Sequence, residues 1–366
     1  MAERTGRLLM IAGGGTGGHI YPAIAIAEEY LTRDASRKVV FVGTEYGLEK
    51  KIVPKAGFPL EFISVGGLKG KSITETIRNV ARLPMGLINS HRLISRYQPV
   101  AILGVGGYAS GPVLMAGALR RIPTIIHESN AFPGLTNRIL ARMVTEAAVA
   151  FPEALERMKR RGEVTGNPVR RDFFRVPPAD VDRTSEKKRL LIFGGSQGSR
   201  IINNTFTTAL PLLEGLADVL EIVHQTGPLD HERIAAAYQG TPFERARVVP
   251  YLDAMWNEIA AADLVVSRAG AMTIGELCAA GRGAVLIPFA LATNNHQEAN
   301  ARVMERAGGA RVITEGELTA ERLASDIEEI FATPEATRSM GLEARKLGVP
   351  DASQKIVDII EKIQRN

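Results

Sequence analysis

The sequence predicts an α/β protein built from two doubly wound domains, and three observations support this class. The chain has 366 residues, more than the roughly 100–200 of one ordinary domain. Short, continuously apolar runs alternate with longer amphipathic stretches, a pattern typical of parallel strands covered by helices on both faces. The glycine-ended run that opens the first half, LLMIAGGGTGGH (8–19), is echoed by LLIFGGSQGSR (190–200).

The strands are expected where the apolar runs are short and continuous, with helices between most of them. A last helix, Ser353–Gln364, follows Pro350. The predicted strands are Leu8–Ala12, Val39–Gly43, Ala101–Val105, Thr124–His127, Leu190–Gly194, Leu220–Gln225, Ala246–Pro250, Leu264–Ser267 and Ala284–Pro288.

The segment from Gly166 to Lys188 is rich in proline and charge and lacks periodicity, so it resembles a linker between domains. We therefore expect an N-terminal domain over 1–165 and a C-terminal domain over 166–349. The helical end, 350–366, is free to pack back on the first domain.

Composition limits the function. The formal charge of +5 and pI of about 9.3 favour anionic partners such as phosphates, nucleic acid or an acidic membrane surface. A single cysteine, Cys278, excludes an intrachain disulfide and a multi-cysteine metal site, and fits a reducing cytosol. No export signal and no apolar run of about 18 residues is present, so any membrane contact is expected to be peripheral.

Two glycine loops follow strands and precede helices, a context in which backbone N–H groups and the helix dipole bind anions. In the first loop, Gly13, Gly15 and Gly18 match G-x-G-x-x-G. Dinucleotide binding also needs an acidic residue ending the second strand, and Glu45 fits poorly. A purely structural turn is the other alternative. The second loop, Gly194–Arg200, lacks the Gly-Lys-Ser/Thr ending of a nucleotide triphosphatase.

A third glycine group, Gly104–Gly111, and the polar run His127–Asn130 also stand at expected carboxyl ends of strands. Ligands of open α/β sheets bind at those ends. We therefore expect all of these loops to face one cleft between the two domains.

Seven strings together resemble the MurG family of GT-B glycosyltransferases. They are GGGTGGH (13–19), GGYAS (106–110), HESN (127–130), PGLTN (133–137), GNPVR (166–170), GGSQGS (194–199) and SRAGAMTIGE (267–276). They run in order through both halves. The resemblance implies a GT-B fold, in which two Rossmann-like domains face each other across a cleft.

The resemblance also implies a reaction. An inverting N-acetylglucosaminyltransferase would move GlcNAc from UDP-GlcNAc to the C4 hydroxyl of MurNAc in undecaprenyl-pyrophosphoryl-MurNAc-pentapeptide. This converts lipid I to lipid II in peptidoglycan synthesis, on which cell-wall biogenesis, cell shape and cell division depend. It implies no cofactor and no metal, and no D-x-D motif stands at a strand end.

The implied partners are UDP-GlcNAc, lipid I and the anionic inner membrane, with other cell-wall enzymes as candidates and no nucleic acid. The implied location is cytoplasmic and peripheral, on the inner face of the plasma membrane. Two rival functions stay open. One is another GT-B enzyme, such as a UDP-GlcNAc 2-epimerase. The other is a non-catalytic module that binds polyprenyl phosphates.

The resemblance assigns residues to the donor. Glu276 would hold the ribose of UDP, although a solvated acid at a helix start is the simpler explanation. Leu252 would meet uracil, Gln297 the sugar hydroxyls, and Arg170 and Ser196 the phosphates, with Arg171 as an alternative to Arg170. The remaining donor residues are Thr16, Gly17, Gly18, Asn130, Ala271, Met272, Thr273 and Ile274.

Two residues are candidates for the general base. His19 follows the first glycine loop at a helix N-terminus, where the dipole favours a neutral imidazole that can take a proton. Its alternative role is a phosphate contact or a helix cap. Glu128 is the rival, with a structural hydrogen bond as its alternative, and His127 is expected to pack against the sheet.

The acceptor lipid is expected to meet Gly104, Gly106, Gly107 and Tyr108. In the segment Lys69–Arg96, apolar residues including Ile73 and Ile77 recur at three- and four-residue steps among basic ones. A basic amphipathic helix can lie on anionic lipid. A helix packed into the core gives the same pattern, and Pro84 indicates a break.

Overall fold

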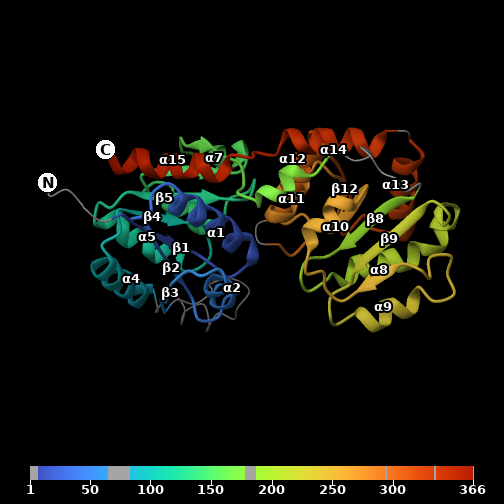
Figure 1. The fold of residues 1–366 in the computed structure, drawn as a ribbon, viewed down its shortest axis with the longest axis horizontal. Coiled ribbons are helices and arrows are strands. Elements are labelled where there is room, and N and C mark those ends of the chain that lie inside the picture. The colour runs from blue at the N-terminus through green and yellow to red at the C-terminus, as the bar shows by residue number, and fades with distance from the viewer. Residues whose placement is uncertain (1–6, 65–82, 178–186, 293–294, 334, 366) are drawn as a thin grey trace. The chain divides into compact units, whose positions relative to one another are not determined.

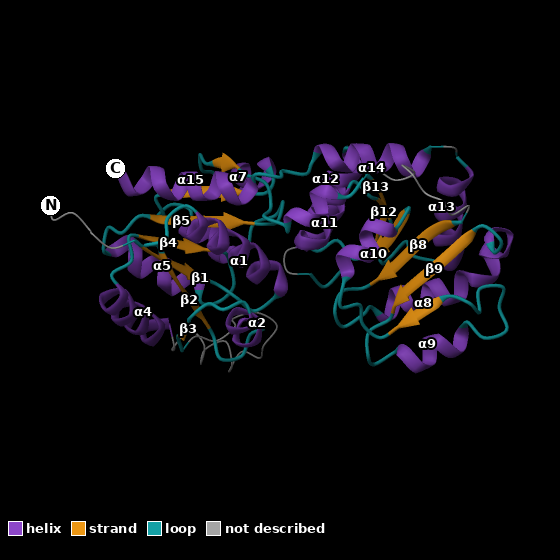
Figure 2. Ribbon diagram, in the orientation of Figure 1, coloured by secondary structure: helices purple, strands orange, loops and turns teal. Residues whose placement is uncertain are grey.

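The computed structural model describes residues 7–64, 83–177, 187–292, 295–333 and 335–365. Residue contacts divide the chain into two compact units, Met1–Val169 together with Asp351–Asn366, and Arg170–Pro350. Each unit contains one sheet of parallel strands with helices packed around it (Figures 1 and 2). The prediction of an α/β protein with two doubly wound sheets is confirmed.

The sheet of the N-terminal unit has seven strands in the order β3-β2-β1-β4-β5-β6-β7, all paired in parallel. Strand order reverses between β1 and β4, so this gap is the topological switch point. The strands are β1 (Leu8–Ala12), β2 (Lys38–Gly43), β3 (Leu60–Phe62), β4 (Ala101–Gly104), β5 (Thr124–Glu128), β6 (Glu146–Val149) and β7 (Glu163–Val164).

Both faces of this sheet are buried. Because side chains alternate along a strand, Leu9 and Ile11 of β1 join one apolar cluster while Met10 and Ala12 join another. The helices of the unit are α1 (Gly17–Thr32), α2 (Glu49–Lys55), α4 (Leu83–Tyr97), α5 (Ser110–Leu119), α6 (Leu135–Leu140), α7 (Pro152–Met158) and α15 (Ala352–Arg365).

The sheet of the C-terminal unit has six parallel strands in the order β10-β9-β8-β11-β12-β13. Its switch point lies between β8 and β11. The strands are β8 (Lys188–Phe193), β9 (Leu220–Gln225), β10 (Arg247–Val249), β11 (Leu264–Ser267), β12 (Gly283–Leu286) and β13 (Ala310–Val312). The helices and turns of the unit are η1 (Arg171–Arg175), α8 (Arg200–Ala209), η2 (Leu210–Leu216), α9 (His231–Ala237), α10 (Met255–Ala261), α11 (Ala271–Ala280), α12 (His296–Arg306), α13 (Ala320–Ala332) and α14 (Ala336–Lys346).

The C-terminal helix α15 lies in the N-terminal unit, against α1 (Figure 1). Its apolar side joins the core of that unit through Ile356, Val357, Ile359, Ile360 and Ile363. The helix is therefore an integral part of a unit whose other elements lie nearly 200 residues or more before it in the sequence.

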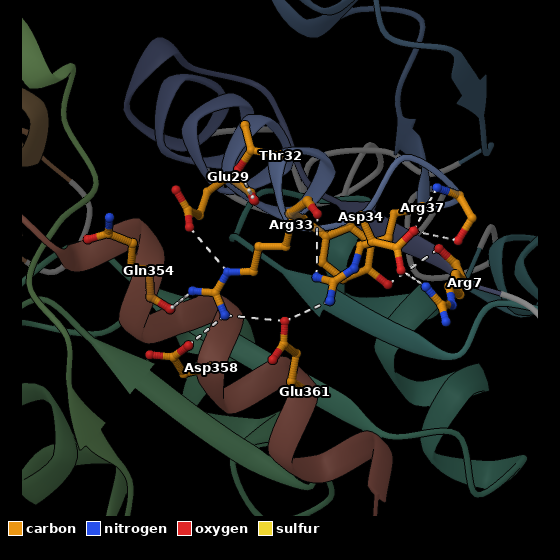
Figure 3. A network of polar contacts seen from close by, with 11 residues as sticks. Arg7, Glu29, Thr32, Arg33, Asp34, Arg37, Gln354, Asp358 and Glu361 are labelled. Atoms are coloured by element: carbon orange, nitrogen blue, oxygen red, sulfur yellow. Dashed lines mark hydrogen bonds and ion pairs between the residues drawn. The ribbon is translucent and has the colours of Figure 1, made fainter.

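Ion pairs and hydrogen bonds at the edge of this apolar contact also join α15 to the residues that follow α1 (Figure 3). The Arg33 guanidinium donates to a carboxylate oxygen of Asp358 at 2.6 Å and to the Gln354 carbonyl at 3.0 Å. Arg37 donates to Glu361 at 2.7 Å. One end of α1 and the turn after it thus hold three successive turns of α15.

The expected strands all occur, and β1, β9 and β11 have the predicted bounds. The structure adds β3, β6, β7 and β13, which span two to four residues each. Each is short, and alanine, glutamate or arginine interrupts its apolar pattern, so the sequence gives little signal. In the described part of the chain, no helix combines the length and apolarity needed to cross a bilayer.

Candidate active site

The second glycine loop follows β8 at the switch point of the C-terminal unit. It folds as a tight turn in which the Gly198 N–H donates to the Gly195 carbonyl at 2.9 Å. Gly198 and Gly227 adopt φ of +74° and +82°, and a Cβ on Gly198 would lie 1.9 Å from the Thr226 carbonyl oxygen. The loop therefore packs backbone against backbone, which only glycine permits.

The predicted phosphate residue Ser196 is exposed in this turn. After the loop, α8 begins at Arg200 with Ser199 as its N-cap residue. Both the turn and the helix start present backbone donors on the carboxyl side of β8, a geometry suited to an anion.

The loop after the neighbouring strand β11 and the start of α11 lie on the other side of the site from the glycine loop. Gly270 caps α11, whose first residues are the predicted Ala271, Met272, Thr273 and Ile274. Glu276 lies farther along this helix and is half-buried. Burial raises the pKa of its carboxyl to about 7, although the positive charge of Arg170 acts in the opposite direction. No residue in the described ranges donates a hydrogen bond to this carboxylate.

Gln297, at the start of α12, forms hydrogen bonds with two loops of the site, the one after β11 and the one after β12. Its side-chain oxygen accepts from the Phe289 N–H at 3.0 Å and from the Ala269 N–H at 3.3 Å. The oxygen is therefore used within the protein. The side-chain NH₂ group is the part of Gln297 that can donate to a ligand.

These elements line a cavity of about 590 Å³, a size suited to a small-molecule ligand. Of the predicted donor residues, Thr273 and Gln297 line it directly, beside glycines of the loop. Leu252 is buried after β10, outside the lining of this cavity, and Arg170 is exposed at the start of η1. The Arg170 side chain lies over the Phe173 ring at 5.6 Å.

The sequence reasoning missed two charged residues in the cavity wall, Arg268 and Glu315. Arg268 forms an ion pair of 2.6 Å with Glu315 and donates to the Ile287 and Pro288 carbonyls. Burial lowers the pKa of Arg268. A charged residue directly after a buried strand, inside SRAGAMTIGE, was a usable signal for Arg268, whereas no local pattern points to Glu315.

In the N-terminal unit, the first glycine loop lies at the switch point between β1 and β4. The Gly13 N–H donates to the Val42 carbonyl at 3.0 Å, and the Gly14 N–H donates to the Gly106 carbonyl at 3.3 Å. A Cβ on Gly107 would lie 2.4 Å from the Gly14 carbonyl oxygen. The first and third glycine groups are therefore in contact.

His19 is half-buried in the first turn of α1. Its Nδ1 lies 3.1 Å from the Gly14 carbonyl oxygen. A carbonyl can only accept, so in the neutral ring this contact assigns the proton to Nδ1 and leaves a lone pair on Nε2. The Thr16 hydroxyl, 3.4 Å from the same Nδ1, then accepts as well. A Cβ on Gly106 would come within 2.9 Å of Nε2, so this glycine makes room for the imidazole.

The rival base, Glu128, is buried at the end of β5 and surrounded by donors. One carboxylate oxygen accepts from the Asn130 N–H and side-chain NH₂, both at 3.0 Å. The other accepts from the Gly134 N–H at 3.0 Å and the Asn137 side chain at 2.8 Å. These four bonds shape the loop after β5 and favour the structural alternative for Glu128.

The other predicted residues of this unit are distributed around the same loops. His127 is fully buried, and burial lowers its pKa to about 4, so the imidazole is neutral. Thr16 and Tyr108 are exposed, with Gly17 and Gly18 at the start of α1 and Gly104 ending β4. Ile73 and Ile77 lie outside the described residues.

The paired Rossmann-like units, with ligand loops at both switch points, define the GT-B class of glycosyltransferases, and solved structures agree. Acinetobacter baumannii MurG is 29% identical, with a TM-score of 0.80 over 97% of this chain and 99% of that one. The fold also matches UDP-GlcNAc 2-epimerase from Neisseria meningitidis bound to UDP-GlcNAc, at 13% identity and a TM-score of 0.67 over 97% of this chain and 99% of that one.

The chain belongs to glycosyltransferase family 28. The N-terminal domain model of that family matches residues 9–149, and its C-terminal domain model matches residues 189–356. A relative from Myxococcus xanthus is 45% identical over 96% of this chain and 91% of its own length, and one from Syntrophus aciditrophicus is 44% identical over 96% and 97%. Both are named UDP-N-acetylglucosamine--N-acetylmuramyl-(pentapeptide) pyrophosphoryl-undecaprenol N-acetylglucosamine transferase.

Proposed function

We propose that this enzyme transfers GlcNAc from UDP-GlcNAc to the C4 hydroxyl of MurNAc in undecaprenyl-pyrophosphoryl-MurNAc-pentapeptide, forming lipid II from lipid I. The observation that carries the proposal is the cavity between the second glycine loop and the start of α11, with Glu276 on that helix. The names of full-length relatives at about 45% identity support the acceptor, since they specify a pyrophosphoryl-undecaprenol substrate.

Glu276 suits the ribose of UDP. The Glu276 carboxylate is partly desolvated and receives no hydrogen bond from the described residues. Such a group is stabilised when a ligand donates hydrogen bonds to it. The two ribose hydroxyls supply them. Leu252 would then meet the uracil through its backbone.

The phosphates of UDP suit the two adjacent N-termini. Ser196, the backbone around Ala271 and Met272, and the hydroxyl of Thr273 offer hydrogen bonds, and Arg170 adds positive charge. Such donors stabilise UDP as the bond to the sugar breaks, because negative charge then develops on the leaving phosphate. Gln297 and Asn130 would donate to the sugar itself, with Ile274 packing behind the loop.

His19 is the general base of the proposal. Its Nε2 takes the proton of the C4 hydroxyl as that oxygen attacks the anomeric carbon, and the bonding pair leaves with UDP. Attack from the side opposite the phosphate inverts the anomeric configuration. Glu128 is less suitable, because its four hydrogen bonds occupy the carboxylate.

The acceptor would meet the first and third glycine groups of the N-terminal unit. Thr16, Gly17 and Gly18 precede or begin α1, where the helix dipole favours a pyrophosphate. Gly104, Gly106 and Gly107 pack against Leu114, His19 and Gly14 respectively, so their role beside the acceptor would be to shape the loop. The exposed Tyr108 ring follows them in the sequence and is the side chain that would meet the acceptor.

We also propose that the enzyme works on the cytoplasmic face of the plasma membrane as a peripheral protein. Met85 and Ile88 on α4 and Leu119 at the end of α5 are 51%, 47% and 70% exposed. Arg120 donates to the Ser95 hydroxyl at 2.6 Å and so joins the end of α5 to α4. Apolar side chains beside the exposed Arg92 suit an anionic lipid surface.

One assay tests the reaction. The purified protein is incubated with UDP-GlcNAc and a short-chain lipid I analogue in the presence of EDTA, and UDP release is measured. Release that depends on the analogue is expected. Release without any acceptor would indicate an epimerase or hydrolase, and binding of UDP-GlcNAc without turnover would overturn both enzymatic functions.

A further inference from the structure

The carboxylate of Glu49, at the start of α2, is a buried charge to which the proposed reaction gives no role. This side chain is 1% exposed. Carboxylates are rarely buried to this degree unless they are paired or hydrogen-bonded. Here the partners are neutral donors: the Gly15 N–H at 2.7 Å, the Thr44 N–H at 2.9 Å and the Thr44 hydroxyl at 2.8 Å.

Three glycines make room for this side chain. A Cβ on Gly14 would lie 2.3 Å from Glu49 Cδ, one on Gly43 would lie 2.6 Å from Cγ, and one on Gly47 would lie 1.9 Å from Oε2. The carboxylate is therefore enclosed by backbone, and the first glycine loop bends around it.

A single peptide group separates Glu49 from His19. The Gly15 N–H that donates to Glu49 and the Gly14 carbonyl that contacts His19 Nδ1 at 3.1 Å belong to the same planar unit. In a trans peptide these two groups point in opposite directions. A negative charge on the N–H side polarises the peptide and makes its carbonyl a stronger acceptor.

We infer that Glu49 is the positioning residue of the His19 base and acts through the Gly14–Gly15 peptide. It fixes the orientation of that peptide, which holds the proton on Nδ1 and leaves the lone pair of Nε2 beside Gly106. A third group that orients the base is a recurring part of acid–base sites. The inference rests on the proposed function of His19.

These hydrogen bonds limit which part of the first glycine loop can bind an anion. The N–H groups of Gly13, Gly14 and Gly15 donate to Val42, Gly106 and Glu49 respectively, so they shape the loop and are not free to bind an anion. A buried carboxylate beside Gly14 would also repel one. The ligand-facing part of the loop therefore begins at Thr16.

A double-mutant cycle tests the link between the two side chains. Glu49→Gln replaces one acceptor oxygen with a donor, and kcat of the lipid I analogue reaction should fall about 10–100-fold, by analogy with residues that orient metal-binding histidines through a hydrogen bond. The dissociation constant of UDP-GlcNAc, measured by calorimetry, should stay within about twofold. In a His19→Ala background, Glu49→Gln should cause no further loss. Glu45→Gln, which removes an exposed charge in the same turn, is the control.

The outcomes separate the two proposals. If His19→Ala leaves kcat intact, the base role fails and this inference fails with it. If His19→Ala lowers kcat and Glu49→Gln lowers it again by the same factor, the base role stands and the link to Glu49 is wrong.

A measurement on the unmodified enzyme keeps the test valid even if Glu49→Gln fails to fold. In ¹⁵N-histidine-labelled protein, the His19 resonances are assigned by their loss in His19→Ala. The neutral ring should show the Nδ1–H tautomer. The Nε2–H tautomer would overturn the inference.

Discussion

Arg268 and Glu315 form an ion pair of 2.6 Å in the wall of the cavity, with side chains that are only 13% and 20% exposed. Arg268 also lies over the Phe289 ring at 5.2 Å. The pair joins the loop after β11 to the loop after β13, and so connects two strand ends that the sheet separates by β12.

Glu315→Gln should destabilise the protein, because it leaves the Arg268 charge partly buried without its counter-ion. Breaking a fully buried pair from one side costs about 3–5 kcal/mol, and this partly exposed pair should cost somewhat less. Urea unfolding measures the loss. Glu343→Gln, which breaks an exposed pair with Lys346, should cost less than about 1 kcal/mol. Equal losses in the two variants would contradict the prediction.

Donor affinity should depend on pH through Glu276. Burial raises the pKa of this carboxyl to about 7, and only the ionised form accepts both ribose hydroxyls. As pH rises from 6 to 8 the ionised fraction grows, so UDP-GlcNAc should bind about tenfold more tightly. Calorimetry at several pH values measures this change. In Glu276→Gln the affinity should be weaker and flat with pH.

The stability of the free enzyme should change with pH in the opposite direction. The folded pKa of Glu276, about 7, lies above the ordinary glutamate value of 4.5, so the native state binds more protons than the unfolded state between these two pH values. The associated stability is complete below about 4.5 and is lost as pH rises through about 7. Glu276→Gln should therefore raise Tm at pH 8 and have little effect on Tm near pH 4.

Gly198→Ala should disable the phosphate loop. The new Cβ would lie 1.9 Å from a carbonyl oxygen, at a φ of +74° that alanine rarely adopts. We expect a stability cost of about 1–3 kcal/mol and a loss of UDP-GlcNAc affinity of at least about tenfold. Gly215→Ala is the matched control, since nothing lies within 4 Å of its added Cβ. Unchanged affinity in Gly198→Ala would mean that the turn does not hold the phosphates.

Arg33→Ala should loosen α15 from α1. Arg33 bonds to Asp358, Glu361 and the Gln354 carbonyl from a side chain that is 22% exposed. A network of this kind contributes about 1–2 kcal/mol, and less at high salt. Urea unfolding at low and high NaCl measures the difference. Lys362→Ala, at a more exposed pair with Glu163, should have a negligible effect.

Replacing the apolar pair on α4 should weaken membrane association. Met85→Ser with Ile88→Ser removes two exposed apolar side chains, and binding to vesicles rich in anionic phospholipid should fall about tenfold or more. Sedimentation with vesicles measures the bound fraction. Leu229→Ser, which removes a similar side chain that is 87% exposed in the other unit, should leave it unchanged. Equal binding by all three proteins would exclude α4 as the contact.

Much of the fold could be predicted because its long strands are continuously apolar and end in glycine. Leu8–Ala12 is an example, since five apolar residues, four of them buried, are followed directly by Gly13. β6 and β13 could not be predicted, because alanines with a glutamate in β6 and an arginine in β13 leave no continuous run of large apolar residues.

The candidate site was predictable to the extent that it is local. Glycine loops and helix starts carry their own signal, as at Gly194–Ser199 and Ala271–Ile274. Contacts between segments that are far apart in the sequence leave no such local signal. Glu49 lies 34 residues from Gly15, and Glu315 lies 47 residues after Arg268. Only the folded sheet, which places successive strand ends at one edge, brings those carboxylates to their partners.

The placement of α15 has a consequence for synthesis on the ribosome. Residues 170–350 form one uninterrupted stretch of chain, whereas the N-terminal unit is assembled from both ends of the sequence. The isoleucines that complete its core, from Ile356 to Ile363, are translated after the whole C-terminal unit. The N-terminal unit should therefore finish folding after the C-terminal unit, and the side of α1 that contacts α15 should stay uncovered until α15 has been made.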